Sequence, residues 1–187
     1  AGLTMTNLQS ICTGGVLNKK TGGPGCSIVA SPASGIYYAN DDVDLNAYTF
    51  PSNKNYVFLI NGKLEVYGKV ALNSGATFTA SVKDNITIDK NLGTTGTSTL
   101  SSMEGFYSTD KSFIVETSGS CPDLRLNIVG AIVVNAGKTG GSFQNNRTLC
   151  AQNATCPVLS ITYRPDLLVK TPTFVKHSPV VWKESAP

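Results

Sequence analysis

The chain has 187 residues, of which 41% are hydrophobic and 14% are charged, and its net charge at pH 7 is +3. This length fits one domain, or at most two small ones, with a core of its own, and the positive charge is too small and too scattered to imply nucleic-acid binding. No apolar run approaches the ~20 residues that cross a bilayer, so we expect no membrane span and place any anchor outside this sequence.

Residues 1–34 are rich in glycine and turn-forming residues, which predicts a loop-rich N-terminal segment. From residue 35 to residue 141 apolar residues recur at every second position in many places, as they do in strands that bury one face. Strands are predicted at residues 56–60, 64–66, 70–72, 78–82, 86–88 and 113–115.

The chain changes character after residue 141, where prolines become frequent and the alternation weakens. One helical turn is expected near Asp166, followed by an extended tail with a strand at residues 180–182. We expect residues 142–187 to form a C-terminal cap that belongs to the same structural domain as residues 1–34 and 35–141.

Two short phrases of the sequence recur further along the chain. The phrase around Gly35 returns at Gly105, and the phrase around Gly62 returns at Gly130, in the same order and at nearly the same offset. A shorter spacing of about 20–22 residues also separates neighbouring apolar segments, and such a period is typical of stacked rungs. We therefore predict an all-β protein, a β-solenoid similar to a parallel β-helix with an internal duplication; the alternative is a β-sandwich or jelly roll.

The five cysteines indicate a compartment that permits disulfides. The short separations predict the pairs Cys150–Cys156 and Cys12–Cys26, which leaves Cys121 free or joined to another chain. This composition favours an extracellular or cell-surface location. The sequence also contains three Asn-x-Thr sequons, in which the glycosylation candidates are Asn85, Asn146 and Asn153.

The densest acidic stretch is the one candidate for a metal site. Asp42, Asp44 and Asn46 alternate, so a strand would place their oxygen atoms on one face, where they could ligate Ca²⁺. A polar, solvent-facing strand or turn explains the same pattern. No other cofactor is expected.

Catalytic motifs are missing from the sequence. His177 is the only histidine and has no nucleophile motif beside it. The run Gly137-Lys138-Thr139 lacks the first glycine of a phosphate-binding loop, since that position holds Ile132. The chain is therefore expected not to be an enzyme.

Several short phrases follow one another in a fixed order over roughly residues 55–187. The phrases V-x-G-N-I-Y-I-D, G-I-Y, V-x-G-A-L-I-A, R-T-L and Y-D-P-R-x-L…P-P…W-x-E are matched by residues 82–89, 105–107, 128–134, 147–149, 163–168, Pro172 and 182–184. In this order the chain resembles the C-terminal domain of uncharacterised surface proteins of candidate-phyla bacteria, the Patescibacteria, which include the Saccharibacteria. The resemblance implies a surface location and a β-solenoid-like fold. Arg164 and Asp166 are exchanged around Pro165 relative to the usual phrase, so an ion pair there is expected to form differently.

These observations favour a non-enzymatic extracellular module of a bacterial envelope, structural or adhesive, such as a subunit of a surface filament or pilus. The alternative is a carbohydrate-binding or polysaccharide-active β-helix, to which an aligned strip of tyrosines would contribute stacking faces. The partners expected are other protein subunits, including further copies of the chain, or cell-surface glycans and proteins, and not nucleic acid.

Overall fold

The structure is a computed structural model that describes residues 4–20, 22–135 and 140–170. Its elements, in chain order, are β1 (Met5–Asn7), η1 (Leu8–Ile11), η2 (Thr13–Gly15), β2 (Gly35–Ala39), β3 (Val43–Leu45), β4 (Tyr48–Phe50), β5 (Asn55–Ile60), β6 (Leu64–Val66), β7 (Val70–Leu72), β8 (Thr77–Val82), β9 (Ile86–Ile88), β10 (Met103–Thr109), β11 (Phe113–Val115), β12 (Leu126–Val133), β13 (Phe143–Asn145), η3 (Cys150–Ala154), β14 (Leu159–Thr162) and α1 (Pro165–Lys170). The expected strand at residues 180–182 lies outside the described residues.

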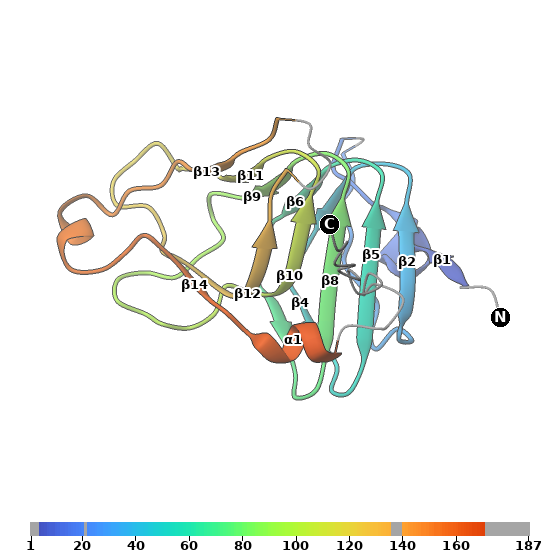
Figure 1. Ribbon diagram of the computed structural model, residues 1–187. Coiled ribbons are helices and arrows are strands. Elements are labelled where there is room, and N and C mark those ends of the chain that lie inside the picture. Colours follow the sequence, from blue (N-terminus) through green and yellow to red (C-terminus); the bar gives the residue numbers. More distant parts are fainter. Residues whose placement is uncertain (1–3, 21, 136–139, 171–187) are drawn as a thin grey trace, which may run out of the picture.

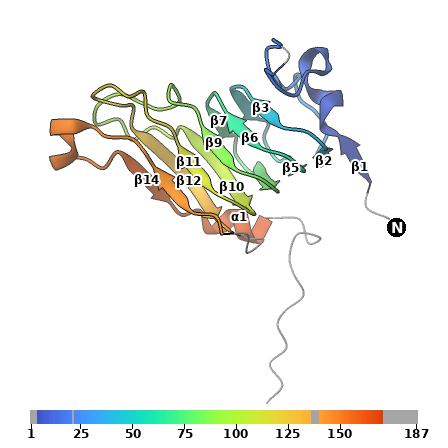
Figure 2. The same ribbon diagram turned by 90° about the horizontal axis from the view of Figure 1, so that it is seen from above.

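The chain winds into a β-solenoid of about four turns, which confirms the predicted fold class. A long sheet follows the order β1-β2-β5-β8-β10-β12-β14, with β4 and β7 joined to it through β10, and a short sheet follows the order β3-β6-β9-β11-β13. Every pairing between these strands is parallel. Figures 1 and 2 show the strands stacked from the N-terminal segment at one end to β14 at the other.

The register confirms the predicted rung length in the first turns. Ile36 pairs with Val57 and Val57 pairs with Thr79, so successive rungs begin at nearly equal intervals along the chain. Thr79 then pairs with Phe106 after a longer interval, because a longer loop separates β9 from β10. The period therefore lengthens where loops leave the body, while the strands keep their places in the stack.

Of the two recurring phrases, the first joins equivalent positions of the solenoid and the second does not. Gly35 lies in one column of the long sheet with Tyr56, Phe78 and Gly105, so the first phrase recurs after three rungs. The next residue in this column is Gly130. Gly62, in contrast, lies in the turn between β5 and β6, so the second phrase does not join equivalent positions.

Stacked aromatic rings fill the space between the two sheets. Tyr56, Phe78 and Tyr107 come from successive rungs and are fully buried. Phe78 stacks on Phe50 with 4.5 Å between ring centroids, and it meets Tyr107 edge-on at 5.8 Å. Such pairs add ~0.5–1.5 kcal/mol each to the gain from burial, so each rung is stabilised by its neighbours.

The N-terminal segment covers one end of this core. Leu8 and Ile11 of η1 are buried, and the disulfide between Cys12 and Cys26 closes the segment with the two Cα atoms 4.9 Å apart. The backbone N–H of Cys26 donates to the carbonyl of Asp44 in β3. The segment therefore pairs with the edge of the short sheet at this end.

A second disulfide fastens the loops at the other end. It joins Cys121 to Cys150, whose Cα atoms are 6.1 Å apart, while Cys156 is free and buried. The predicted Cys150–Cys156 pair is therefore wrong, because η3 fills the short chain between them and Cys150 faces the loop of the preceding rung. The predicted Cys12–Cys26 pair is confirmed.

The buried carboxylate of Asp123 organises the same loops. It accepts hydrogen bonds from the backbone N–H groups of Ser118 and Thr148, at 2.7 and 3.0 Å, and from the hydroxyls of Ser118 and Thr117. Burial alone would raise the pKa of Asp123, but these donors outweigh it and lower the pKa to about 2.

This carboxylate should make the protein sensitive to acid. A pKa depressed from an unfolded value of ~3.9 contributes up to about 2 kcal/mol above that pH and loses it as the pH falls toward 2. Asp123→Asn should therefore destabilise the protein at pH 7 but change its stability little near pH 2, as measured by urea unfolding at both values. Asp84→Asn, which removes an exposed ion pair with Lys111, is the control and should cost less than ~1 kcal/mol. An equal loss for Asp123→Asn at both pH values would contradict this role.

Candidate functional site

The acidic stretch expected to bind calcium is tied to the N-terminal segment. Asp42 forms an ion pair with Lys20 and accepts the backbone N–H of Lys63 at 2.8 Å. Burial works against its charged form, but these donors outweigh burial and lower the pKa of Asp42. Asp44 is buried within β3 and accepts the backbone N–H of Lys19, while the amide of Asn46 donates to the carbonyl of Pro24. Both carboxylates thus have partners within the protein, and the calcium site stays a prediction.

A different set of carboxylates comes together on the outer side of the short sheet. Glu65, Asp89 and Glu116 each place one oxygen atom within 4.8 Å of the others. Burial and then the neighbouring acids raise the pKa of Glu65, against a hydrogen bond from Tyr67 that lowers it. The ammonium of Lys19 lies over the ring of Tyr67, 3.1 Å from its centroid, which brings a positive charge beside the acids. These are the described residues that could share a divalent cation.

No sequence motif marks this acidic cluster, but the positions of its residues relative to the strands of the short sheet do. Asp89 and Glu116 each follow directly after a strand of the short sheet, β9 and β11, which pair in register. Only the rung alignment reveals that these residues, distant along the chain, are neighbours. Asp89 also accepts the backbone N–H of Asn91, and this hydrogen bond holds the turn after β9.

The glycosylation candidates lie outside the strands. Asn85 precedes β9, and its side-chain oxygen accepts the backbone N–H of Ser112 in the next rung. Asn146 follows β13 and is exposed. Asn153 lies in η3 and is exposed, and its side chain bonds to Leu149 and Thr148. His177, also considered as a site residue, lies outside the described residues.

The aromatic residues divide between the core and the surface. Tyr37 and Tyr107 are buried among the stacked rings, whereas Tyr38, Phe106 and Tyr67 are half-buried. A single stacking strip of all five is therefore excluded, because neighbouring strand residues point to opposite faces of a sheet.

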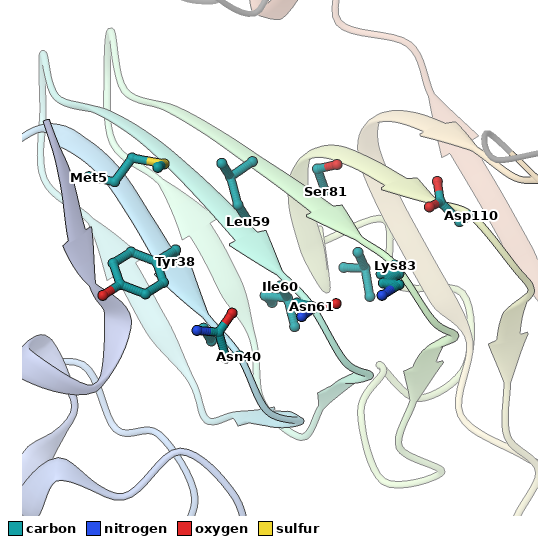
Figure 3. A pocket seen from close by; sticks show the side chains of 11 residues that line it. Met5, Tyr38, Asn40, Leu59, Ile60, Asn61, Ser81, Lys83 and Asp110 are labelled. Carbon is teal, nitrogen blue, oxygen red and sulfur yellow. The ribbon is translucent and has the colours of Figure 1, made fainter. Parts of the chain in front are cut away.

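A shallow groove crosses the outer face of the long sheet near the carboxyl ends of its strands. Its volume is about 420 Å³, and Figure 3 shows Tyr38, Leu59 and Ser81 along one side. These three residues are register partners on β2, β5 and β8. On the other side lies a polar row, one residue per rung, that consists of Asn40, Asn61, Lys83 and Asp110.

The far end of the solenoid exposes strand edges and apolar side chains. Among the described residues, β14 pairs only with β12 and β13 pairs only with β11. Ile161 is 47% exposed beside Tyr163, which is 55% exposed. Phe143 stacks flat on Phe113 at 5.5 Å and is itself 40% exposed. We call this surface, formed by β13, β14 and Tyr163, the open end.

The closing segment joins the body through an ion-paired arginine. Arg164 bonds to Asp166 with 2.6 Å between Nη2 and Oδ2, and it lies 3.7 Å from Glu104 of β10. Helix α1, the expected helical turn, then lies against β8 (Figure 1). Its residue Leu167 is buried. The exchanged order of Arg164 and Asp166 thus still forms an ion pair across Pro165.

Comparison with known proteins identifies no relative of the chain. No family model, curated protein or solved structure matches the chain. Among the helices of the described residues, none has the length and hydropathy of a transmembrane segment. The two disulfides indicate an oxidising environment.

Proposed function

We propose that the protein is a non-enzymatic surface module, structural or adhesive, whose copies add to one another end to end. The observation that carries this proposal is that, over the described residues, the long sheet ends in two unpaired parallel edges, β1 and β14. Each such edge presents backbone N–H and C=O groups on which another strand can form.

The parallel arrangement of the strands determines the relative orientation in which two copies would join. Because all strands of the long sheet run in one direction, β1 of a second copy can extend the sheet beyond β14 without reversing it. The two joined surfaces differ, so the contact is head to tail. Repetition of a head-to-tail contact that does not close into a ring gives a filament.

The apolar side chains of the open end support the same association. Ile161, Tyr163 and Phe143 would lose contact with water under a further rung, and burial yields ~25 cal/mol for each Å² of apolar surface. On the short sheet the N-terminal segment already pairs with β3 through Cys26. In the part of the chain that the structure describes, both edge strands of the long sheet thus lack a partner on one side. On the short sheet, the edge at β3 is covered by the N-terminal segment.

A location on the cell surface fits the other features of the chain. The two disulfides need an oxidising environment. The ordered phrases of the sequence resemble those of surface proteins of candidate-phyla bacteria, and the fold implied by that resemblance is the one observed. We propose the bacterial envelope as the setting of the assembly.

A charge placed on either edge should prevent assembly. Ile161→Lys in β14 and Thr6→Lys in β1 change exposed side chains, so each variant should fold normally yet sediment as a monomer at concentrations where the wild type forms larger species. Leu100→Lys is the control, since Leu100 is 68% exposed but lies in a loop between β9 and β10. Analytical ultracentrifugation over a range of concentrations measures the difference.

A wild-type protein that stays monomeric at the highest soluble concentration, with or without calcium, would refute the end-to-end contact. Equal loss of assembly in Leu100→Lys would show that added charge, and not the strand edge, is responsible.

A further inference from the structure

The polar row of the groove has the regular spacing of the rungs. Asn40, Asn61 and Lys83 each follow the last residue of a paired strand, since Ala39 pairs with Ile60 and Ile60 with Val82. Neighbouring strands lie ~4.8 Å apart, so the row presents one polar side chain at each such step across the sheet. Figure 3 shows these side chains beside one another along the groove.

The two amides of this row are not used by the fold. Asn40 and Asn61 are exposed, and their side chains make no hydrogen bond to the described part of the protein. Other asparagines do hold the structure together: Asn127 donates to the carbonyls of Ser98 and Leu100. The groove amides are therefore available to an outside ligand.

Two further hollows share lining residues with this row. Asn40 also lines a second hollow, of about 390 Å³, together with Asn7, Gln9 and Asn18. Asn61 also lines a third hollow, of about 290 Å³, which reaches the turns that follow β5, β8 and β10. Adjoining hollows that share lining residues suit a long ligand laid across the strands.

We propose that this groove binds an extended, uncharged oligosaccharide that runs across β2, β5 and β8. Each amide can donate and accept at once, which suits neighbouring hydroxyl groups of a sugar. The half-buried ring of Tyr38 offers a stacking face at one side of the groove. Lys83 and Asp110 carry opposite charges, so the row as a whole is neutral and suits a ligand without net charge.

The strands beneath the groove cannot bind a peptide by strand addition. β2, β5 and β8 are each paired on both sides within the long sheet, so their N–H and C=O groups have no capacity for strand addition. The groove therefore offers side chains only, which include the two amides, the hydroxyl of Ser81 and the ring of Tyr38 beside aliphatic and charged groups. Met5 of β1 contributes to the lining of the groove, but the open end lies apart from it, so changes at β14 test the end-to-end contact without touching the groove.

The test measures binding to oligosaccharides of cellulose, chitin and mannan, with an acidic oligogalacturonate for comparison, by titration calorimetry. At least one neutral oligosaccharide should bind. Asn40→Ala and Asn61→Ala should each lower its affinity roughly fivefold to tenfold. Tyr38→Ala should weaken binding while Tyr38→Phe retains most of it. Asn73→Ala removes an exposed amide outside the groove and should leave affinity unchanged.

Three results would overturn the proposal. The first is that none of the neutral oligosaccharides binds the wild type. The second is that one binds but all groove variants retain its affinity. The third is that a ligand of another class, the acidic oligogalacturonate or an unfolded polypeptide such as reduced casein, binds the groove in place of the neutral sugars. Ile161→Lys should leave sugar binding unchanged, which separates this site from the open end.

Discussion

Arg147→Ala is expected to lower the free energy of unfolding by about 3–5 kcal/mol, because it removes a buried cation that connects several turns of the solenoid. The side chain of Arg147 is only 5% exposed. Its guanidinium donates to four backbone carbonyls, those of Asp89, Leu92, Glu116 and Leu124, at 2.7, 2.7, 2.7 and 3.1 Å.

The expected loss has two parts. The substitution leaves four carbonyl groups without a donor, and a buried polar group without a partner costs ~1–3 kcal/mol. It also removes the positive charge that faces Asp89, Glu116 and Asp123. Arg147→Lys keeps the charge but loses the fork of donors, so its loss should be intermediate. Urea unfolding with the disulfides intact measures all three proteins, and a loss below ~1 kcal/mol for Arg147→Ala would contradict this role.

Gly130→Ala is expected to destabilise the protein by about 3 kcal/mol or more, or to prevent folding, because the two adjacent rungs touch at this point. A methyl group on Gly130 would overlap the carbonyl oxygen of Gly105, the register partner in the neighbouring strand. The backbone of Gly130 also has a φ of 154°, which other residues rarely adopt.

Gly35 provides a matched control for this substitution. It lies in the same column of the long sheet, three rungs from Gly105, but a methyl group there would meet nothing within 4 Å. Gly35→Ala should therefore leave the midpoint of thermal unfolding within a few degrees of the wild type. If both alanines proved equally harmful, the close approach of β10 and β12 would not be the cause.

Much of the fold could be predicted because its signals are local. Alternation along strands such as β5 and β8, and the regular spacing between them, follow from one rung covering the next. The second recurring phrase was misleading, since Gly62 lies in a turn while Gly130 lies in a strand. Glycine recurs in both places because the backbone of a neighbouring rung leaves no room for a side chain, that of Asp41 at Gly62 and that of Gly105 at Gly130.

The disulfide pairing depends on contacts that the sequence does not display. Cys150 and Cys156 are close along the chain, but Cys121 is brought beside Cys150 when the loops of successive rungs stack. The backbone hydrogen bond from Asp123 N–H to the Thr148 carbonyl fixes that stacking. Prediction by sequence separation fails here because loop lengths vary from rung to rung.

The candidate surfaces were harder to predict than the strands. The acidic stretch is the densest group of carboxylates in the sequence, yet Asp42 and Asp44 are held by the N-terminal segment. The amides Asn40 and Asn61 are common surface residues in the sequence, and only the register places them in one row. A site made by stacking one residue per rung has no local motif.

Hydrogen exchange measured at low and high protein concentration tests the end-to-end contact most directly. If copies join through the long sheet, the backbone amides of β14 and β1 that face outward should exchange more slowly as concentration rises, while those of the loop around Leu100 stay unchanged. Ile161→Lys should abolish this added protection. Association without slower exchange in β14 and β1, or protection confined to other strands, would contradict the account.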